Sequence, residues 1–282
     1  MPDVVVSNPD RVVFPKIGLT KGELVDYYAR VAPQMVPHLV GRPLTIQIFP
    51  KGVDEPGSFL KERRKHFPDW VASAEVPKKG GTIVMPVIDS ADALKYIANQ
   101  GMVVPHVWLT RSDDPLHPDR MVFDLDPSTD DLGLVRRTAL LLRDVLSDRG
   151  VVPFVKSTGS RGLHVTVPLD RSAHGDDVRA FAQTIAAELV EREPDTLTTE
   201  FSKADRGDRL YLDILRNGWA QTEVAPYGVR PRPTAPVAAP LEWDEIAKFE
   251  PEKWTVRNLF RRLAKRDDPW ARMDASAGPL PT

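Results

Sequence analysis

Two aspartates end an apolar run near the middle of the chain. Asp124 and Asp126 close the sequence Met-Val-Phe-Asp-Leu-Asp, and Pro127 follows directly. In a strand, residues two positions apart point to the same side, so both carboxylates would face one way. Like charges held that close repel unless a cation lies between them, and Mg²⁺ and Mn²⁺ prefer carboxylate oxygen. The pair predicts a divalent-metal site, with a solvated Asp pair at a strand end as the alternative.

Asp213 is the candidate for a third carboxylate. It lies in Arg209–Leu215, which alternates like a strand, with Leu210, Leu212 and Ile214 on one face. A carboxylate inside an apolar strand must have a partner. Three acids on two strands would hold two divalent cations about 4 Å apart, an arrangement used for phosphoryl or nucleotidyl transfer. A solvated strand face is the alternative.

The loop Ser157–Leu163 is the second chemical feature. It joins two predicted strands, and its glycines allow backbone N–H groups to approach an anion closely. The hydroxyls, the Arg161 guanidinium and the His164 imidazole can donate to phosphate oxygens. The loop lacks the spacing of a Walker motif. A plain Ser/Gly hairpin and a core histidine remain the alternatives for its parts.

Composition excludes several classes of protein. The chain has 282 residues and no cysteine, which excludes disulfides, zinc fingers and thiol nucleophiles. Its formal net charge of −2 argues against a protein that coats nucleic acid, although a local basic groove is compatible with it. No segment approaches the roughly 18 apolar residues of a membrane helix, and the N-terminus does not read as a secretory signal. We expect a cytoplasmic protein with one large domain or two packed lobes.

Helical and strand patterns alternate without a strict βαβ order, which fits an α+β fold as well as α/β. Thr20–Leu39 reads as a helix with a capping box from Thr20 and Glu23 and with an end or kink at Pro33. The proline-rich Pro231–Pro240 is expected to be an extended linker, and Ala275–Thr282 a disordered tail. The other predicted helices are Ser90–Gln100, Leu132–Asp148 and Asp176–Arg192, and the other predicted strands are Arg42–Phe49, Val103–Thr110, Arg120–Leu125, Val151–Lys156 and His164–Pro168.

Taken together, the motifs resemble a known family. The stretches FDLDP, STGSRGLHV and LYLDILRN resemble the three signature motifs of the archaeo-eukaryotic primase superfamily. The chain is most similar to the bacterial primase-polymerase branch, typified by the polymerase domain of the end-joining ligase D. The match runs from about Asn8 to Glu245 and includes NPDRVVFP, HPDRMVFDLDP and QTEVAPYGVRPRPTAPV. The resemblance implies one primase-polymerase domain over residues 1–282: a mixed α/β fold, with a central sheet that carries the acids, flanking helices and two closely packed lobes.

The resemblance also assigns roles to residues. Asp124, Asp126 and Asp213 become the catalytic metal ligands. The implied nucleotide-binding residues are His106, Thr158, Ser160, Arg161, His164, Arg206 and Arg230. The implied DNA-binding residues are Arg11, Lys21, Phe59, Lys61 and Lys203. Taken alone, a basic side chain of this kind is more often an ordinary solvated residue.

Among the DNA contacts, Arg11 and Lys21 match positions that grip a 5′-phosphate. Lys21 opens the first predicted helix, and a turn at Pro15 and Gly18 could fold the two cations onto one phosphate. The sequence departs from the family pattern in four places: Arg161 replaces a usual Lys, Thr158 a usual Ser, Val104 a common acid, and Phe59-Leu60 the usual paired Phe. The cation-rich KERRKH follows that last pair.

The function implied is template-dependent addition of nucleotides, preferentially ribonucleotides, to primer 3′-OH ends at short gaps or breaks with a 5′-phosphate. Two Mn²⁺ or Mg²⁺ ions would serve as cofactors. The resemblance further implies a stand-alone, monomeric, nucleoid-associated repair protein that works with proteins such as a ligase or Ku and not with membranes. Two alternatives stay open: a metal-dependent phosphohydrolase or nuclease that uses the same acids, and a catalytically silent nucleic-acid-binding module.

Overall fold

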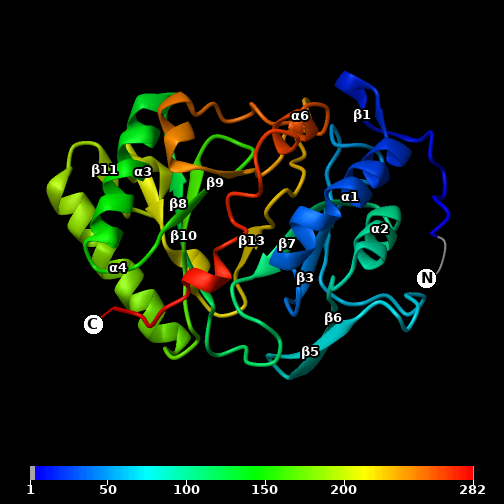
Figure 1. Ribbon diagram of the computed structural model, residues 1–282, viewed down its shortest axis with the longest axis horizontal. Coiled ribbons are helices and arrows are strands. Elements are labelled where there is room, and N and C mark those ends of the chain that lie inside the picture. Colours follow the sequence, from blue (N-terminus) through cyan, green and yellow to red (C-terminus); the bar gives the residue numbers. More distant parts are fainter. Residues whose placement is uncertain (1–3, 282) are drawn as a thin grey trace. The chain divides into compact units, whose positions relative to one another are not determined.

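The computed structural model describes residues 4–281 and divides into two compact units (Figure 1). The first unit contains the chain up to Pro115 together with Thr222–Ala238 and Trp254–Lys265. The second unit contains Leu116–Gln221, Ala239–Lys253 and the chain from Arg266 onward. Both units mix helices with sheets, so the predicted mixed α/β fold is confirmed.

A six-stranded sheet forms the framework of the second unit, in the order β11-β12-β8-β10-β9-β14. Neighbouring strands are antiparallel except β11 and β12, which are parallel. The strands are β8 (Arg120–Asp126), β9 (Phe154–Ser157), β10 (Leu163–Pro168), β11 (Leu197–Thr198), β12 (Leu210–Asp213) and β14 (Pro240–Leu241).

Two long helices pack against this sheet: α3 (Leu132–Ser147) and α4 (Gly175–Arg192) (Figure 1). Asp131 caps α3 by accepting a hydrogen bond from Leu134 N at 3.1 Å. Along β8 the acids alternate with Phe123 and Leu125, both fully buried. The apolar face of this strand therefore fixes its orientation and leaves the carboxylates on the opposite face.

The first unit is built around a four-stranded antiparallel sheet in the order β13-β7-β3-β4. Its strands are β3 (Leu44–Ile48), β4 (Ser58–Leu60), β7 (Met102–Trp108) and β13 (Thr222–Val224). Two antiparallel pairs stand apart from it: β1 (Val12–Phe14) with β2 (Leu19–Thr20), and β5 (Ser73–Lys78) with β6 (Gly81–Pro86). The β5–β6 pair packs an apolar cluster that contains Val76 and Met85 against Trp108.

Helices α1 (Lys21–Met35) and α2 (Ala91–Asn99) pack against each other in this unit (Figure 1). The predicted capping box is present, because Glu23 N donates to Thr20 Oγ1 while Thr20 N donates to the Glu23 carboxylate. Pro33 neither ends nor divides α1, which continues to Met35. A 3₁₀ turn, η2 (Val36–His38), then replaces the last predicted helical turn. The remaining short elements are η1 (Pro15–Ile17), α5 (Lys203–Arg206), η3 (Leu215–Asn217), η4 (Trp243–Lys248), α6 (Leu259–Leu263) and η5 (Asp274–Ser276).

Two expected irregular segments are ordered instead. The segment Pro231–Pro240, expected to be an extended linker, is packed into the protein, because Val237, Ala238 and Ala239 are buried and hydrogen-bonded. Proline restricts the backbone but leaves carbonyls and apolar surface available for packing. The disordered-tail prediction also fails for the described part of the tail, because Asp170 N donates to Gly278 O at 2.9 Å. Thr282 lies outside the described residues.

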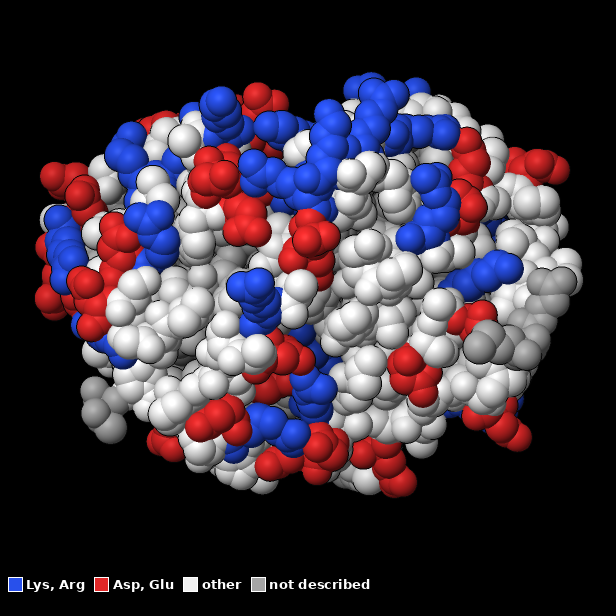
Figure 2. Space-filling view, in the orientation of Figure 1, with Lys and Arg blue, Asp and Glu red and all other residues white. Residues whose placement is uncertain are grey.

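No helix in residues 4–281 is long and apolar enough to cross a membrane. On the face in Figure 2, basic and acidic side chains are interspersed, in keeping with the small net charge.

Candidate functional site

Three neighbouring strands of the second unit bring the predicted catalytic residues into register. Asp213 of β12 lies opposite Asp124 of β8, and His164 of β10 lies opposite Asp124 on the other side. Lys156 of β9 in turn lies opposite His164. Directly paired antiparallel residues share a face, so these four side chains form one row across the sheet. Asp126, two residues along β8, lies on the same face.

Asp124 is the most enclosed of the three acids, with 14% of its side chain exposed. His164 Nε2 lies 3.5 Å from its Oδ1, and Arg216 Nη2 lies 3.5 Å from its Oδ2. Burial alone would raise the pKa of this carboxyl, but His164, Arg216 and Lys156 outweigh that effect and hold the pKa below its usual value. Asp124 is therefore kept ionised by the hydrogen bond from His164 and by the positive charges of Arg216 and Lys156.

The pKa of Asp213 is shifted in the opposite direction, above its usual value. Its Oδ1 accepts a hydrogen bond from Leu215 N at 2.8 Å, and Arg216 Nε lies 3.8 Å from its Oδ2. Burial raises the pKa of Asp213, and the negative charge of Asp124 adds to the increase. The neighbouring Tyr211 hydroxyl is affected too, because burial and then Asp213 raise its pKa to about 12. The carboxylates of Asp124 and Asp213 therefore repel each other, and a cation between β8 and β12 relieves that repulsion.

Asp126 lies beside this row, is more exposed than the other two acids and faces two arginines. Arg206 Nη1 is 3.3 Å from its Oδ2, and Arg161 Nη2 is 3.7 Å from its Oδ1. Arg206 is buried, donates to the carbonyls of Glu200 and Phe201, and stacks 3.7 Å above the Tyr211 ring. This side chain is thus fixed by the protein itself, whereas Arg161 is 44% exposed.

The three carboxylates fit a divalent cation in chemical type, since hard ions prefer oxygen ligands, and they share one face of one sheet. In the part of the chain that is described, no three His, Cys, Asp or Glu side chains converge as a ready metal cluster. Arg216 instead reaches both Asp124 and Asp213 and balances their charge. A divalent ion at this position would take over that role from the guanidinium.

The loop between β9 and β10 is closed by its own threonine. Thr158 Oγ1 donates to Gly162 O at 3.0 Å and accepts from the N–H groups of Ser160 and Gly162. The Thr158 hydroxyl is therefore engaged by hydrogen bonds within the loop. Gly162 has no room for a side chain, because a Cβ there would lie 1.9 Å from the Leu125 carbonyl oxygen. The loop is thus held tightly against β8, with Arg161 at its exposed tip.

Three residues at this site were not singled out from the sequence. Lys156 is fully buried, with its Nζ 2.8 Å from His164 Nδ1. Asn217 donates to Val122 O and accepts from Val122 N, which fastens η3 to β8 and places Arg216 beside the acids. Arg216 and Asn217 are the last two residues of the LYLDILRN motif, and Lys156 directly precedes STGSRGLHV, so their place in or beside a motif was the available signal.

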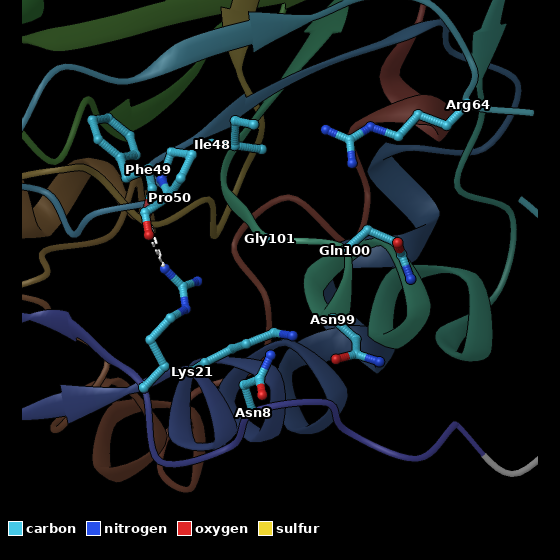
Figure 3. A pocket seen from close by; sticks show the side chains of 10 residues that line it. Asn8, Lys21, Ile48, Phe49, Pro50, Arg64, Asn99, Gln100 and Gly101 are labelled. Carbon is cyan, nitrogen blue, oxygen red and sulfur yellow. Dashed lines mark hydrogen bonds between the residues drawn. The ribbon is translucent and has the colours of Figure 1, made fainter. Parts of the chain in front are cut away.

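Arg11 and Lys21, the predicted phosphate-binding pair, line one pocket of the first unit, with a volume of about 300 Å³ (Figure 3). Arg11 Nη1 donates to the carbonyls of Phe49 and Pro50, at 3.3 and 2.7 Å. Lys21 Nζ donates to Ser7 O at 2.7 Å and to Ser7 Oγ at 2.8 Å. Burial, and then the charge of Arg11, lower the pKa of Lys21. An anion in this pocket would relieve that repulsion.

The remaining predicted residues are distributed over both units. His106, on β7, is half-buried, and its ring lies 5.7 Å from that of Phe59, which is 58% exposed. Arg230 lies beyond β13, where its backbone N donates to Pro236 O. Lys61 is exposed in the first unit, and Lys203 is exposed at the start of α5 in the second.

Comparisons with known proteins agree on one family. The model of the LigD primase-polymerase domain matches residues 20–270. The multifunctional non-homologous end joining protein LigD of Mycobacterium bovis is 34% identical over 97% of this chain, and that of Pseudomonas aeruginosa is 30% identical over 95%. The chain spans only 37% and 32% of the length of these relatives. The solved polymerase domain of Mycobacterium tuberculosis ligase D in complex with DNA matches with a TM-score of 0.92 and 33% identity, over 98% of this chain and all of that one.

Proposed function

The chain belongs to the LigD primase-polymerase domain family, and from that membership we propose that it extends primer 3′-OH ends on a template at short gaps or breaks in DNA. The family consists of metal-dependent polymerases of the nucleotidyltransferase type. The observation that carries the proposal is the row of Asp213, Asp124 and His164 across three strands, with Asp126 on the same face. Such a row suits a reaction in which negative charge gathers on a transferred phosphoryl group.

In this proposal the three aspartates hold two divalent ions, Mn²⁺ or Mg²⁺. When bound, these ions supply acidification of the primer hydroxyl and charge neutralisation at the leaving pyrophosphate. The protein contributes position: β8 and β12 fix the carboxylates, and the Leu215 N–H orients the Asp213 carboxylate at 2.8 Å. No covalent intermediate with the protein is needed.

The triphosphate of the incoming nucleotide is assigned to the loop between β9 and β10. Arg161 supports this assignment, since its exposed guanidinium lies beside Asp126 and matches phosphate oxygens in geometry. His164 presents its Nε2 to the same row of acids. The preference for ribonucleotides rests on the family resemblance. Thr158 and His106 are the candidates for a contact to the sugar hydroxyl.

The DNA partner is a gap or break whose downstream strand carries a 5′-phosphate, and the Arg11 and Lys21 pocket is the proposed receptor for that phosphate. A terminal phosphate carries more charge than a diester, so two enclosed cations favour it. The relatives are named as non-homologous end joining proteins, which supports the same pathway for this chain. Within that pathway we assign it to the nucleoid as a monomer that works with partners such as a ligase or Ku.

The test uses a duplex with a one-nucleotide gap and a 5′-phosphate, incubated with each NTP or dNTP and with Mn²⁺, Mg²⁺ or a chelator. We expect incorporation that follows the template base, requires metal and favours NTPs in single turnover. Release of nucleoside monophosphates without a template would instead identify a phosphohydrolase or nuclease. Binding of the gapped DNA with no reaction under any metal would identify a catalytically silent module.

A further inference from the structure

The pocket that contains Arg11 and Lys21 has a third cation, Arg64, which the family resemblance did not point to. In Figure 3 the Arg64 side chain extends toward the cavity from the side opposite Lys21. Asn8 and Gln100 also line the pocket, and none of its described lining residues is acidic. Three cations around one cavity repel each other unless an anion joins them.

The backbone around Arg64 is held in place by its neighbours. Arg63 donates from Nη2 to the carbonyls of Phe67 and Pro68, at 2.8 and 3.0 Å, and its backbone N donates to Val84 O at 2.7 Å. His66 Nε2 lies 3.0 Å from Gln100 Oε1, which joins this segment to the end of α2. Of two adjacent arginines, Arg63 therefore closes a turn, and Arg64 is directed to the pocket.

The three cations differ in how much of their hydrogen-bonding capacity remains. Lys21 already donates twice to Ser7, and Arg11 donates to two carbonyls of the chain. Arg64 is half-buried, and its side chain makes no hydrogen bond or ion pair with the residues that the structure describes. Its guanidinium fork is therefore entirely available to an anion, and that fork matches phosphate oxygens in pairs.

We propose that Arg64 is a specificity-determining residue that grips the terminal 5′-phosphate from the wall opposite Lys21. This inference rests on the proposed function of the pocket as a 5′-phosphate site. Arg11 and Lys21, tethered to the backbone, provide a fixed positive floor, and Arg64 closes over the phosphate. A 5′-hydroxyl end has no negative charge and no pair of oxygens that matches the fork, so Arg64 should discriminate between the two ends.

The test measures binding of the full chain to a one-nucleotide-gapped duplex whose downstream strand ends in either a 5′-phosphate or a 5′-hydroxyl. The variants are Arg64→Ala, Arg64→Gln and Arg64→Lys. Lys65→Ala is the matched control, because Lys65 is the exposed neighbour of Arg64 in the same segment and does not line the pocket. The double variant Arg11→Ala/Lys21→Ala serves as the reference for loss of the pocket, and thermal melting confirms that each variant is folded.

We expect Arg64→Ala and Arg64→Gln to weaken binding to the phosphorylated gap about tenfold or more, with little change for the hydroxyl gap. Arg64→Lys should recover part of the loss, since it keeps the charge without the fork, and Lys65→Ala should match wild type. Equal losses on both substrates would make Arg64 a general backbone contact and overturn the inference. If Arg64→Ala keeps its selectivity while the double variant loses it, the inference about Arg64 is overturned and the proposed pocket of Arg11 and Lys21 stands. A wild-type protein that does not distinguish the two gaps would refute the pocket itself.

Discussion

Lys156 and His164 form a buried pair, with the Lys156 ammonium 2.8 Å from Nδ1 of the imidazole. An ammonium has donors and no acceptor, so Nδ1 must be the accepting nitrogen of a neutral ring. The ring proton then lies on Nε2, which points to Asp124 Oδ1 at 3.5 Å. Lys156 thus selects the tautomer in which His164 presents a donor to the row of acids and to any phosphate held there.

The first prediction follows from that pair. Lys156→Met keeps the length of the side chain but removes the donor that holds the His164 ring proton on Nε2. His164 then donates less often to the incoming nucleotide, so KM for that nucleotide should rise about tenfold while the protein stays folded. Lys248→Met, which removes an exposed lysine from the same unit, is the control. Steady-state kinetics gives KM and kcat, and the ¹⁵N shifts of the His164 ring report the tautomer. An unchanged ring spectrum together with an unchanged KM would refute the role of Lys156.

Asp213→Asn should nearly abolish nucleotide addition. The amide keeps an acceptor for Leu215 N but removes one of the charges that would hold the metal ions. A loss of several kcal/mol of transition-state stabilisation corresponds to about a thousandfold in rate. Single-turnover extension measures the effect, with the exposed Asp195→Asn as control. Extension at close to the wild-type rate would place the reacting centre elsewhere.

The preference for a 5′-phosphorylated gap over a 5′-hydroxyl gap should fall at alkaline pH, because Lys21 loses its charge. Its lowered pKa means that it loses its charge at a lower pH than an ordinary lysine, whereas the phosphate is already a dianion well below that pH. Preference for the phosphorylated gap should therefore fall as pH rises through the lowered pKa. Lys21→Arg should keep its preference over the same range. Identical profiles for the two proteins would contradict the assignment.

The lowered pKa of Lys21 also makes the free energy of unfolding depend on pH. A lowered lysine pKa means that the unfolded chain binds more protons than the folded one between the two pKa values. The free energy of unfolding should then gain a contribution from Lys21 as pH rises through that interval. Denaturant titrations of wild type and Lys21→Met across the interval would measure it, since the variant lacks the titrating group.

Gly162→Ala should destabilise the second unit. The added methyl would overlap the Leu125 carbonyl at 1.9 Å, so either β8 or the loop must move. Overpacking of this kind costs about 1–3 kcal/mol. Because Asp124 and Asp126 flank Leu125, the movement should also lower activity. Gly278→Ala is the control, since a Cβ there meets nothing within 4 Å. Equal unfolding midpoints for the two variants would show that the loop yields freely.

The sequence was most informative where local rules decide structure. The Thr20–Glu23 capping box and the alternation that places Asp124 and Asp126 on one face both depend on neighbouring residues, and both are present. What the sequence could not provide depends on distant partners. Arg63 and Arg64 are chemically identical, and only the fold directs one to a turn and the other to a pocket. For Thr158, likewise, composition suggests a phosphate donor, and only the closed loop reveals that its hydroxyl is occupied.

The anchoring of Lys21 by Ser7 has a consequence for how the chain can be divided. Asn99 accepts hydrogen bonds from Ser7 N and Oγ, and Ser7 accepts both bonds from Lys21, so the segment before α1 completes the anion pocket. The family model begins at residue 20, beyond Ser7, Asn8 and Arg11. A protein trimmed to that boundary would keep all three aspartates yet release Lys21 from its anchor. If the pocket binds a 5′-phosphate as proposed, the trimmed protein should still add nucleotides but should lose its preference for a 5′-phosphorylated gap.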